Sequence, residues 1–367
     1  MMNFTINRDA LLPGLQAVNS VIERRHTLPV LSNLLLHIDN TGIALTGTDM
    51  EVELHVTIQN PSEIETECTL SARKLLDICR ALPEEATLDF SVEKEKVTLK
   101  SGKSRFTLAT LPAKEFPVTE IAEATTSFEL GQKELKELLD DTMFAMAQQD
   151  VRYYLNGLLL ELEASTIRAV ATDGHRLALK EIAADTGQSE TVQIIVPRKG
   201  VIELSRLLQE EGAPVRLEIS NNHLRLQLES TRLTSKLIDG KFPDYQRVVP
   251  IMSKHPIKAK KDAFKQSLTR ASILSNEKYR GVRLVLKPGC IVALAHNPEQ
   301  EEAEETIEVE YTGEEMEIGF NVNYLIDAIN AIKTEDLIMT STNPDSSCML
   351  LPDGQDNCKY VVMPMRL

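Results

Sequence analysis

The sequence predicts an α+β protein of three repeated domains, in each of which two helices pack on antiparallel sheets. The length of 367 residues exceeds what one hydrophobic core supports, so more than one domain is expected. Similar segments recur at intervals of 124 residues along the chain. Helical patterns alternate with short segments of period two, and the content of hydrophobic (42%) and charged (26%) residues is typical of a globular protein.

The repeat is clearest in a segment of nineteen residues. Leu31–Asp49 and Leu155–Asp173 share seven identical positions, where chance would produce roughly one. A second shift of 124 residues, to Tyr279–Asn297, matches six positions of the second copy. Three units of this length nearly fill the chain. The domains are therefore predicted at residues 1–125, 126–253 and 254–367.

Each predicted domain opens with a helical pattern and contains a second one. The first helices are expected at residues 9–22, 132–146 and 262–274. The second helices start after a serine, a proline or an asparagine, which are residues suited to a helix start, and cover Ser71–Leu82, Pro197–Leu208 and Asn321–Ile332. Pro13 is expected to kink the first helix or to mark its first turn.

Short alternating segments between the helices predict antiparallel hairpins. They are bounded by turn residues such as Asn221-Asn222 and the run Asp39–Gly42. The clearest segments are Val97–Leu99, Phe106–Leu108, Val215–Ile219, Leu224–Leu228 and Met316–Ile318. Two helices and several such strands in each unit make the predicted domains α+β.

Charge is distributed unevenly along the chain. Forty Lys and Arg against fifty-five Asp and Glu give a net charge of −15, which normally argues against binding to nucleic acid. Acidic residues crowd into Glu299–Glu310, where seven of twelve residues are Glu. Basic residues instead lie on the predicted helices or next to them: Arg73, Lys74, Arg80, Lys133, Lys136, Arg198, Lys199, Arg206, Lys258, Lys260, Lys261, Lys265, Arg270, Lys278 and Arg280. Two interpretations stay open, namely solvated helix faces of mixed charge, or a basic surface that follows a phosphate backbone without reading bases.

The sequence also bears on the cellular compartment. The cysteines are odd in number and lack CxxC spacing, so free thiols in a reducing cytoplasm are expected at Cys68, Cys79, Cys290, Cys348 and Cys358. The first residues lack the basic and apolar regions of a signal peptide. No apolar run approaches the ~20 residues that span a bilayer. A cytoplasmic protein without a membrane partner is therefore expected.

The sequence contains only partial matches to catalytic and nucleotide-binding motifs. Gly102-Lys103-Ser104 resembles the end of a phosphate-binding loop, but Val97 stands where the earlier glycine belongs. Asp173 and His175 place a carboxylate near an imidazole without a nucleophile in a recognisable motif, so a turn is favoured over an active site. Histidines and cysteines show no metal-ligand spacing, and no metal or cofactor is expected. An enzyme using this pair and a scaffold that binds only proteins are kept as alternatives.

Eight longer strings are more specific than composition. They run from one end of the chain to the other: Thr46–Asp49, Gln149–Gly157, Ala171–Leu177, Val196–Gly200, Phe242–Tyr245, Leu274–Lys278, Asn297–Glu305 and Tyr360–Leu367. Together they resemble the bacterial DNA sliding clamps, the β subunits of the DNA polymerase III holoenzyme. The resemblance implies three DNA-clamp domains per subunit and a head-to-tail homodimer, closed into a six-domain ring around duplex DNA.

The resemblance also implies a role and a set of partners. The chain would be a processivity factor in DNA replication, a non-catalytic subunit of a DNA-directed DNA polymerase holoenzyme. It would encircle DNA without reading sequence. Short apolar peptide motifs would bring the polymerase III catalytic subunit, the clamp loader, other polymerases and repair proteins to one pocket. Gln246 stands where relatives often carry a second basic residue, which leaves the preference among partners open.

Three sets of site residues follow from the resemblance. The DNA-contacting set is Arg24, Arg25, Arg73, Gln149, Tyr153, Tyr154, Lys199 and Lys278. The partner pocket is Leu155, Thr172, Gly174, His175, Arg176, Leu177, Pro243, Arg247, Val248, Val361, Met363, Pro364, Met365 and Arg366. The dimer interface is Lys74, Ile78, Leu82, Lys103 and Arg105 against Ile273, Leu274, Glu301, Glu302, Glu304 and Glu305. The structural alternatives are one core and one surface tyrosine in the adjoining pair, and a final edge strand with inward methionine at the chain end.

Overall fold

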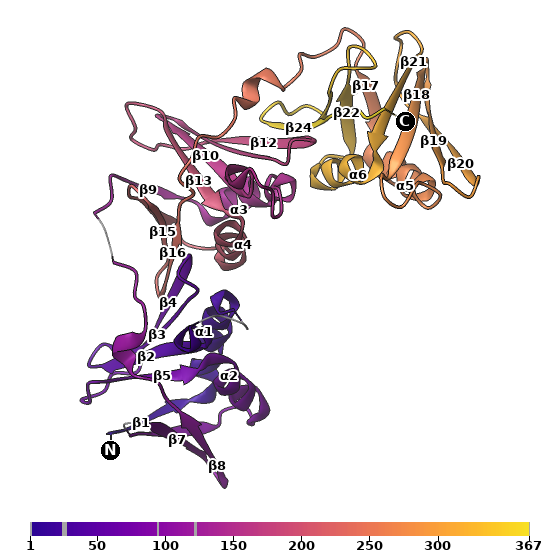
Figure 1. Ribbon diagram of the computed structural model, residues 1–367. Coiled ribbons are helices and arrows are strands. Elements are labelled where there is room, and N and C mark those ends of the chain that lie inside the picture. Colours follow the sequence, from indigo (N-terminus) through magenta and orange to yellow (C-terminus); the bar gives the residue numbers. More distant parts are fainter. Residues whose placement is uncertain (1, 24–27, 94, 121–122, 367) are drawn as a thin grey trace. The chain divides into compact units, whose positions relative to one another are not determined.

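The computed structural model describes residues 2–23, 28–93, 95–120 and 123–366, which form two compact units (Figure 1). The first unit takes in Met1–Gln132, Ile202–Leu207 and Gly212–Leu237. The second takes in Lys133–Val201, Leu208–Glu211 and Ile238–Leu367. Each unit contains one eight-stranded and one four-stranded sheet among its described residues.

Strands from two predicted domains form the eight-stranded sheet of the first unit. Its order is β5 (Thr66–Ser71), β2 (Asn33–Asp39), β3 (Gly42–Thr48), β4 (Val52–Ile58), β16 (Thr231–Lys236), β15 (His223–Gln227), β14 (Val215–Ile219) and β9 (Thr126–Leu130). β4 and β16 join the two halves as an antiparallel pair with Leu54 opposite Leu233. The four-stranded sheet has the order β1 (Met2–Asn7), β6 (Thr87–Val92), β7 (Lys96–Ser101) and β8 (Ser104–Ala109).

The second unit repeats this plan. Its eight-stranded sheet has the order β13 (Val192–Pro197), β10 (Gly157–Glu163), β11 (Thr166–Thr172), β12 (Arg176–Ala183), β24 (Cys358–Val362), β23 (Cys348–Pro352), β22 (Asp336–Thr340) and β17 (Ile257–Lys260). β12 and β24 join the halves, again antiparallel. The four-stranded sheet has the order β20 (Glu302–Glu308), β19 (Cys290–His296), β18 (Gly281–Lys287) and β21 (Met316–Asn321). The predicted antiparallel hairpins are thereby confirmed.

The described residues form six α-helices, two for each predicted domain. They are α1 (Arg8–Val21), α2 (Ala72–Ala81), α3 (Gln132–Asp140), α4 (Arg198–Leu207), α5 (Lys261–Ser272) and α6 (Val322–Ala331). Apolar stripes bury one face of each helix, as on α2, where Leu75 and Leu76 are buried while Arg73 and Lys74 are exposed. None of the helices in the described part of the chain is long and apolar enough to cross a membrane.

Two details differ from the sequence-based expectation. The helix predicted at 132–146 ends at Asp140, and a 3₁₀ turn at Met143–Ala145 follows it. The hydroxyl of Thr142 donates to the carbonyl oxygen of Leu138 at 2.7 Å, which satisfies an acceptor at the helix end. Pro13 occupies the interior of α1, so it does not mark the first turn.

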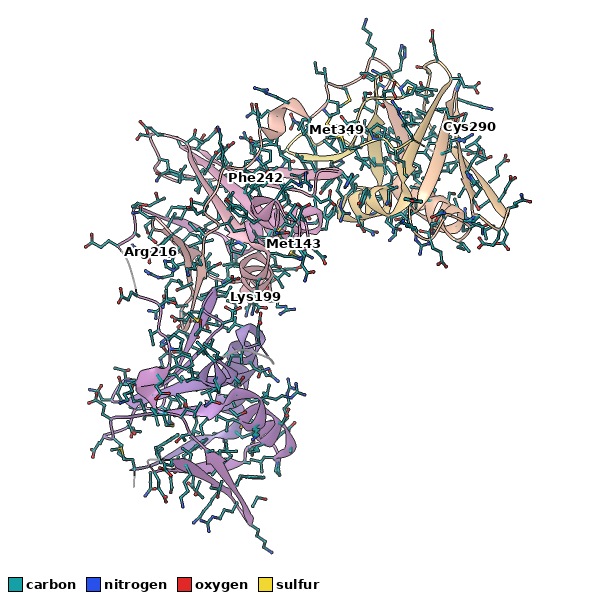
Figure 2. The ribbon with its side chains drawn as sticks, viewed as in Figure 1. Met143, Lys199, Arg216, Phe242, Cys290 and Met349 are labelled. Atoms are coloured by element: carbon teal, nitrogen blue, oxygen red, sulfur yellow. The ribbon has the colours of Figure 1, made fainter. Side chains whose placement is uncertain are left out.

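The cysteines are free, and their burial sets their reactivity. Burial raises the pKa of Cys68 and of Cys348 to about 12. It raises the pKa of Cys79 and of Cys358 to about 11. Cys290, at the start of β19 (Figure 2), is only half-buried.

Because the thiolate is the reactive form of cysteine, we expect a single fast-reacting thiol in the folded chain. An aromatic disulfide reagent at pH 8 should modify one cysteine within minutes, namely Cys290, and all five after denaturation. Mass spectrometry of tryptic peptides would identify the modified residue. Rapid modification of two or more cysteines in the native protein would contradict this assignment.

Candidate functional site

The predicted pocket is centred on an apolar cluster of the second unit. Leu177 and Val361 lie opposite each other on β12 and β24, and Leu155 precedes β10. The cluster also contains buried residues from several strands and from the segment before β17: Ala147, Leu159, Val170, Leu179, Ile195, Phe242, Tyr245, Met349 and Leu351 (Figure 2). Val248 packs against it and is partly buried. The structure therefore brings together four of the predicted pocket residues that lie far apart in the sequence.

A tight turn joins β11 to β12 beside this cluster. Gly174 has a φ of +89°, a conformation that favours glycine. The Thr172 hydroxyl donates to the carbonyl oxygen of Arg176 and accepts the N–H of Gly174. The N–H of Met363 donates to the carbonyl oxygen of His175 at 2.9 Å. The predicted residues of this turn thus meet the chain end directly after β24.

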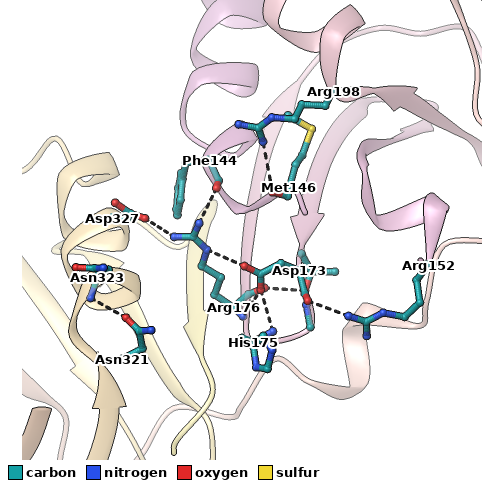
Figure 3. A network of polar contacts seen from close by, with 12 residues as sticks. Phe144, Met146, Arg152, Asp173, His175, Arg176, Arg198, Asn321, Asn323 and Asp327 are labelled. Atoms are coloured by element: carbon teal, nitrogen blue, oxygen red, sulfur yellow. Dashed lines mark hydrogen bonds and ion pairs between the residues drawn. The ribbon is translucent and has the colours of Figure 1, made fainter. Parts of the chain in front are cut away.

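Arg176 connects the turn to α6 and to the segment after α3 (Figure 3). Its guanidinium forms ion pairs with Asp173, at 3.2 Å, and with Asp327. It also donates to the carbonyl oxygen of Phe144 at 2.9 Å and lies over the ring of Tyr324, 4.7 Å from its centroid. Asp327 could not be predicted from the sequence, because 151 residues separate it from Arg176 and no local pattern marks a pair at that distance.

The geometry of Asp173 favours the turn over an active site. Its carboxylate accepts the backbone N–H groups of His175 and Arg176, at 2.9 and 3.0 Å. The imidazole of His175 instead stacks on Tyr324, with ring centroids 6.2 Å apart. The carboxylate therefore shapes the turn, which is the structural alternative that the sequence analysis favoured.

Three of the predicted pocket residues lie in the segment that leads to β17. Pro243 is exposed, and the side chain of Arg247 is 84% exposed while it pairs with Asp244 at 2.7 Å. The carbonyl oxygen of Val248 accepts a hydrogen bond from the hydroxyl of Ser347 at 3.3 Å. These exposed side chains beside a buried cluster leave polar and apolar groups available to a ligand.

The last residues of the chain contact two parts of the second unit, the β11–β12 turn and the sheet of β18 to β21. Met363, Pro364 and Met365 are half-buried, and the N–H of Met365 donates to the carbonyl oxygen of Gly319 on β21 at 2.8 Å. Met365 and Arg366 line a pocket of about 470 Å³ over β18, β19 and β20. The alternative of a final edge strand is wrong, because β24 pairs with both β12 and β23.

The basic residues predicted to contact DNA belong to both units. Arg24 and Arg25 lie outside the described residues. Arg73 is exposed on α2 and pairs with Asp77 at 3.6 Å, and Lys199 lies in the first turn of α4. An ion pair within the helix reduces the net charge that Arg73 presents, as the interpretation of mixed-charge faces expects.

The other residues predicted to contact DNA are Gln149, Tyr153, Tyr154 and Lys278. Gln149 has a φ of +56°, in the turn before the two tyrosines. Tyr153 is 57% exposed, whereas Tyr154 packs against the apolar cluster. One tyrosine is therefore at the surface and one at the core, so only Tyr153 is readily available for stacking on a base. Lys278 places its ammonium 5.2 Å from the centroid of the Tyr279 ring.

The two predicted interface surfaces lie in different units. The first surface is on α2 and the β7–β8 hairpin, and consists of Lys74, Ile78, Leu82, Lys103 and Arg105. The second is on β20 and after α5, and consists of Ile273, Leu274, Glu301, Glu302, Glu304 and Glu305. Ile273 is 72% exposed, which is unusual for an isoleucine. Glu305 already pairs with Arg270 at 2.6 Å within the chain.

The structure is thus a scaffold of repeated α+β units, with an apolar cluster beside a polar turn in the second unit. Sequence models of the DNA polymerase III beta subunit match the chain in three parts: the N-terminal domain at residues 2–120, the central domain at 129–244 and the C-terminal domain at 246–366. The chain therefore belongs to the family of DNA polymerase III beta subunits, which are non-catalytic sliding clamps built from three clamp domains.

Individual relatives agree with this membership over their whole length. The beta sliding clamps of Pseudomonas putida strain KT2440 and Escherichia coli strain K12 are 50% and 47% identical, with 100% of each chain covered. A crystal structure of the Pseudomonas aeruginosa sliding clamp with ligand has a TM-score of 0.97 at 48% identity, and covers 100% of both chains. Another structure of that protein, with a TM-score of 0.96 and the same identity and coverage, is bound to griselimycin.

Proposed function

We propose that two copies of this chain form a head-to-tail ring that encircles duplex DNA and tethers a DNA polymerase to it. The domain division at 1–125, 126–253 and 254–367 and a cytoplasmic location are part of this proposal. Residence on DNA would come from topology, while loose phosphate contacts allow sliding. The polymerase III catalytic subunit, the clamp loader and other polymerases or repair proteins would bind one at a time at the pocket around Leu177 and Val361.

The order of the strands carries the proposal of a head-to-tail contact. In both eight-stranded sheets, two four-stranded halves join through an equivalent antiparallel pair, β16 with β4 and β24 with β12. The two four-stranded sheets end at β8 and β20. In the repeat, β8 corresponds to β16 and β24, and β20 corresponds to β4 and β12. Pairing β8 of one copy with β20 of another would make a third sheet of the same order, with β1 and β21 at its edges.

Charge and apolar exposure support the same contact. Lys103 and Arg105 are exposed on the β7–β8 hairpin, and Glu302 and Glu304 are exposed on β20. Exposed Ile273 adds an apolar group near the acidic strand. Apolar contacts surrounded by opposite charges are typical of interfaces between subunits. A head-to-tail interface closes into a ring or continues as a filament, and the resemblance favours the closed dimer.

The helices support contact with a polyanion. The six helices contain twelve Lys and Arg against eight Asp and Glu, a net charge of +4, although the whole chain has a net charge of −15. An excess of positive charge on the helices and of negative charge elsewhere would hold DNA against helices without base-specific contacts. The exposed Arg73 and Arg80 are examples of the helical bases that would serve this purpose.

The pocket supports recognition of short apolar motifs. Buried Leu155 and Leu177 provide an apolar floor, and half-buried Met363, whose N–H is bonded to the β11–β12 turn, provides an adaptable side chain next to that turn. A relative that is 48% identical over the whole chain binds griselimycin, so ligand binding by this chain is also proposed. Griselimycin is therefore a suitable probe of the proposed pocket.

A synthesis assay on long primed circular DNA tests the proposed function. With the polymerase III catalytic subunit, the clamp loader and ATP, addition of the chain should lengthen the products of a single binding event by an order of magnitude or more. A variant lacking Met363–Leu367 should form the ring but leave the products short. Products of equal length with and without the chain would contradict the proposal.

A further inference from the structure

A line of polar side chains crosses the eight-stranded sheet of the second unit. It consists of four consecutive cross-strand partners on β13, β10, β11 and β12, which are Gln193, Glu161, Arg168 and Glu181. Glu161 accepts hydrogen bonds from Gln193, at 2.5 Å, and from Arg168. Arg168 also donates two hydrogen bonds to Glu181, at 2.9 and 2.5 Å. We call these four residues the polar ladder.

Tyr245, from the segment before β17, forms hydrogen bonds with two residues of this ladder. Its hydroxyl donates to Glu161 Oε1 at 2.9 Å and accepts from Arg168 Nη1 at 3.1 Å. Tyr245 is 6% exposed and Glu161 is 5% exposed, so these bonds are shielded from water. Burial raises the pKa of Tyr245, and the hydrogen bond to Glu161 raises it further, so the hydroxyl keeps its proton.

The next line of cross-strand partners on the same face of the sheet is apolar. Ile195, Leu159, Val170 and Leu179 follow one another across the same four strands and belong to the apolar cluster of the pocket. The ring of Tyr245 belongs to that cluster too. Tyr245 therefore lies at the border, with its ring on the pocket floor and its hydroxyl on the polar ladder.

Besides these hydrogen bonds, the contacts of the segment that leads to β17 include the packing of Val248 against the apolar cluster and the hydrogen bond from Ser347 to its carbonyl oxygen. Between residues 241 and 247, Phe242 and Tyr245 are the two buried residues, and the other five are exposed. The carbonyl oxygen of Tyr245 accepts the N–H of Val248 at 3.1 Å, so the position of the tyrosine determines where the following residues lie. A mobile segment would have to be ordered when a ligand binds, which lowers affinity.

We propose that Glu161, Arg168 and Tyr245 are positioning residues of the pocket, which hold the segment 243–248 in the conformation that binds partners. This inference rests on the proposed function of the pocket. Phe242 anchors the segment through its ring alone, whereas the tyrosine adds a directional contact that fixes the segment along the sheet. Loss of the hydroxyl should leave the ring buried and release the segment.

The substitution Tyr245→Phe tests the proposal with griselimycin as the ligand. We expect the dissociation constant, measured by calorimetry, to rise roughly tenfold because the free segment must be ordered on binding. Amide hydrogen exchange should rise in residues 242–249 and stay unchanged in β10, β11 and β12. Glu161→Gln, which keeps the shape but removes the carboxylate, should show the same pattern and serves as a second variant where Tyr245→Phe folds poorly.

Tyr311→Phe is the matched control. Tyr311 is also buried, at 8% exposure, and its hydroxyl donates to the carbonyl oxygen of Glu314 at 2.7 Å, outside the apolar cluster. This variant should bind griselimycin as the parent does. The comparison shows whether an effect arises from the loss of any buried tyrosine hydroxyl or from the loss of the contact with Glu161 and Arg168.

The outcomes distinguish this inference from the proposed pocket. Parent-like affinity and exchange in Tyr245→Phe would overturn the inference, and so would faster exchange throughout the sheet with unchanged affinity, which indicates a purely structural role. If deletion of Met363–Leu367 abolishes griselimycin binding while Tyr245→Phe has no effect, only the positioning role fails. If the deletion leaves binding intact, the proposed pocket fails.

Discussion

Deletion of Met363–Leu367 is expected to weaken binding of griselimycin and of partner proteins at least about 100-fold, ~2.7 kcal/mol, while the chain stays folded. The deleted segment contains half-buried Met363, next to the β11–β12 turn, and half-buried Met365, which lines the pocket over β18, β19 and β20. It also contains the N–H of Met363 that is bonded to the carbonyl oxygen of His175, so its loss frees the turn as well. Surface plasmon resonance with the polymerase III catalytic subunit, and calorimetry with griselimycin, measure the effect.

Two controls accompany the deletion. The melting temperature should fall by no more than a few degrees, because β24 ends at Val362 and keeps its pairing with β12 and β23. Ile251→Asp removes an apolar side chain that is 86% exposed but lies outside the predicted pocket, and it should leave both affinities unchanged. Polymerase binding that survives the deletion would refute the assignment of the pocket.

Reversal of Arg105 to Glu is expected to raise the dissociation constant of the homodimer by two orders of magnitude or more, roughly 3 kcal/mol. Within the first unit, the joint between β16 and β4 places Arg232 opposite His55. On the same pattern, Arg105 of one copy would lie opposite Glu304 of the next. A glutamate there would face the acids of β20, and like charges at a partly desolvated interface repel strongly. Sedimentation velocity at nanomolar concentration measures the monomer fraction.

The charge-swapped double variant makes this test specific. Arg105→Glu combined with Glu304→Arg restores opposite charges in the proposed pair and should recover most of the dimer. Lys96→Glu is the control within the same sheet, because Lys96 is exposed at the other end of the β7–β8 hairpin and pairs with Glu93 at 3.2 Å. Unchanged sedimentation of Arg105→Glu at low concentration would count against the proposed interface.

The fold could be predicted to the extent that local patterns determine it. The helices α2, α4 and α6 follow from apolar spacing after a start signal, and their observed bounds lie within one residue of the predicted segments. The helix expected at 132–146 stops early, and a distant contact forms beyond its end. Asp141 turns to pair with Lys180, at 2.6 Å and 39 residues away, and helical spacing contains no information on such a partner.

A string in the sequence predicts local structure where it is also a turn in space. Thr172 to Leu177 are contiguous, so the turn between β11 and β12 could be predicted from their motif. Asp327 lies on α6, and only the packing of that helix beside the turn brings it to Arg176. The polar ladder and the contacts of Tyr245 depend on strand register, because Glu161 meets Arg168 only when β10 pairs with β11 in this alignment. Tyr245 stood inside a recognised string, but the string alone does not show what its hydroxyl contacts.

Retention on DNA of defined topology tests the central claim most directly. The clamp loader and ATP would assemble the chain on nicked circular DNA, and gel filtration in high salt would separate bound from free protein, since salt weakens phosphate contacts but not encirclement. We predict that the protein elutes with the circles and is released when one restriction cut makes them linear. Equal retention on circular and linear DNA, or release from the circles by salt alone, would contradict a ring that holds DNA by topology.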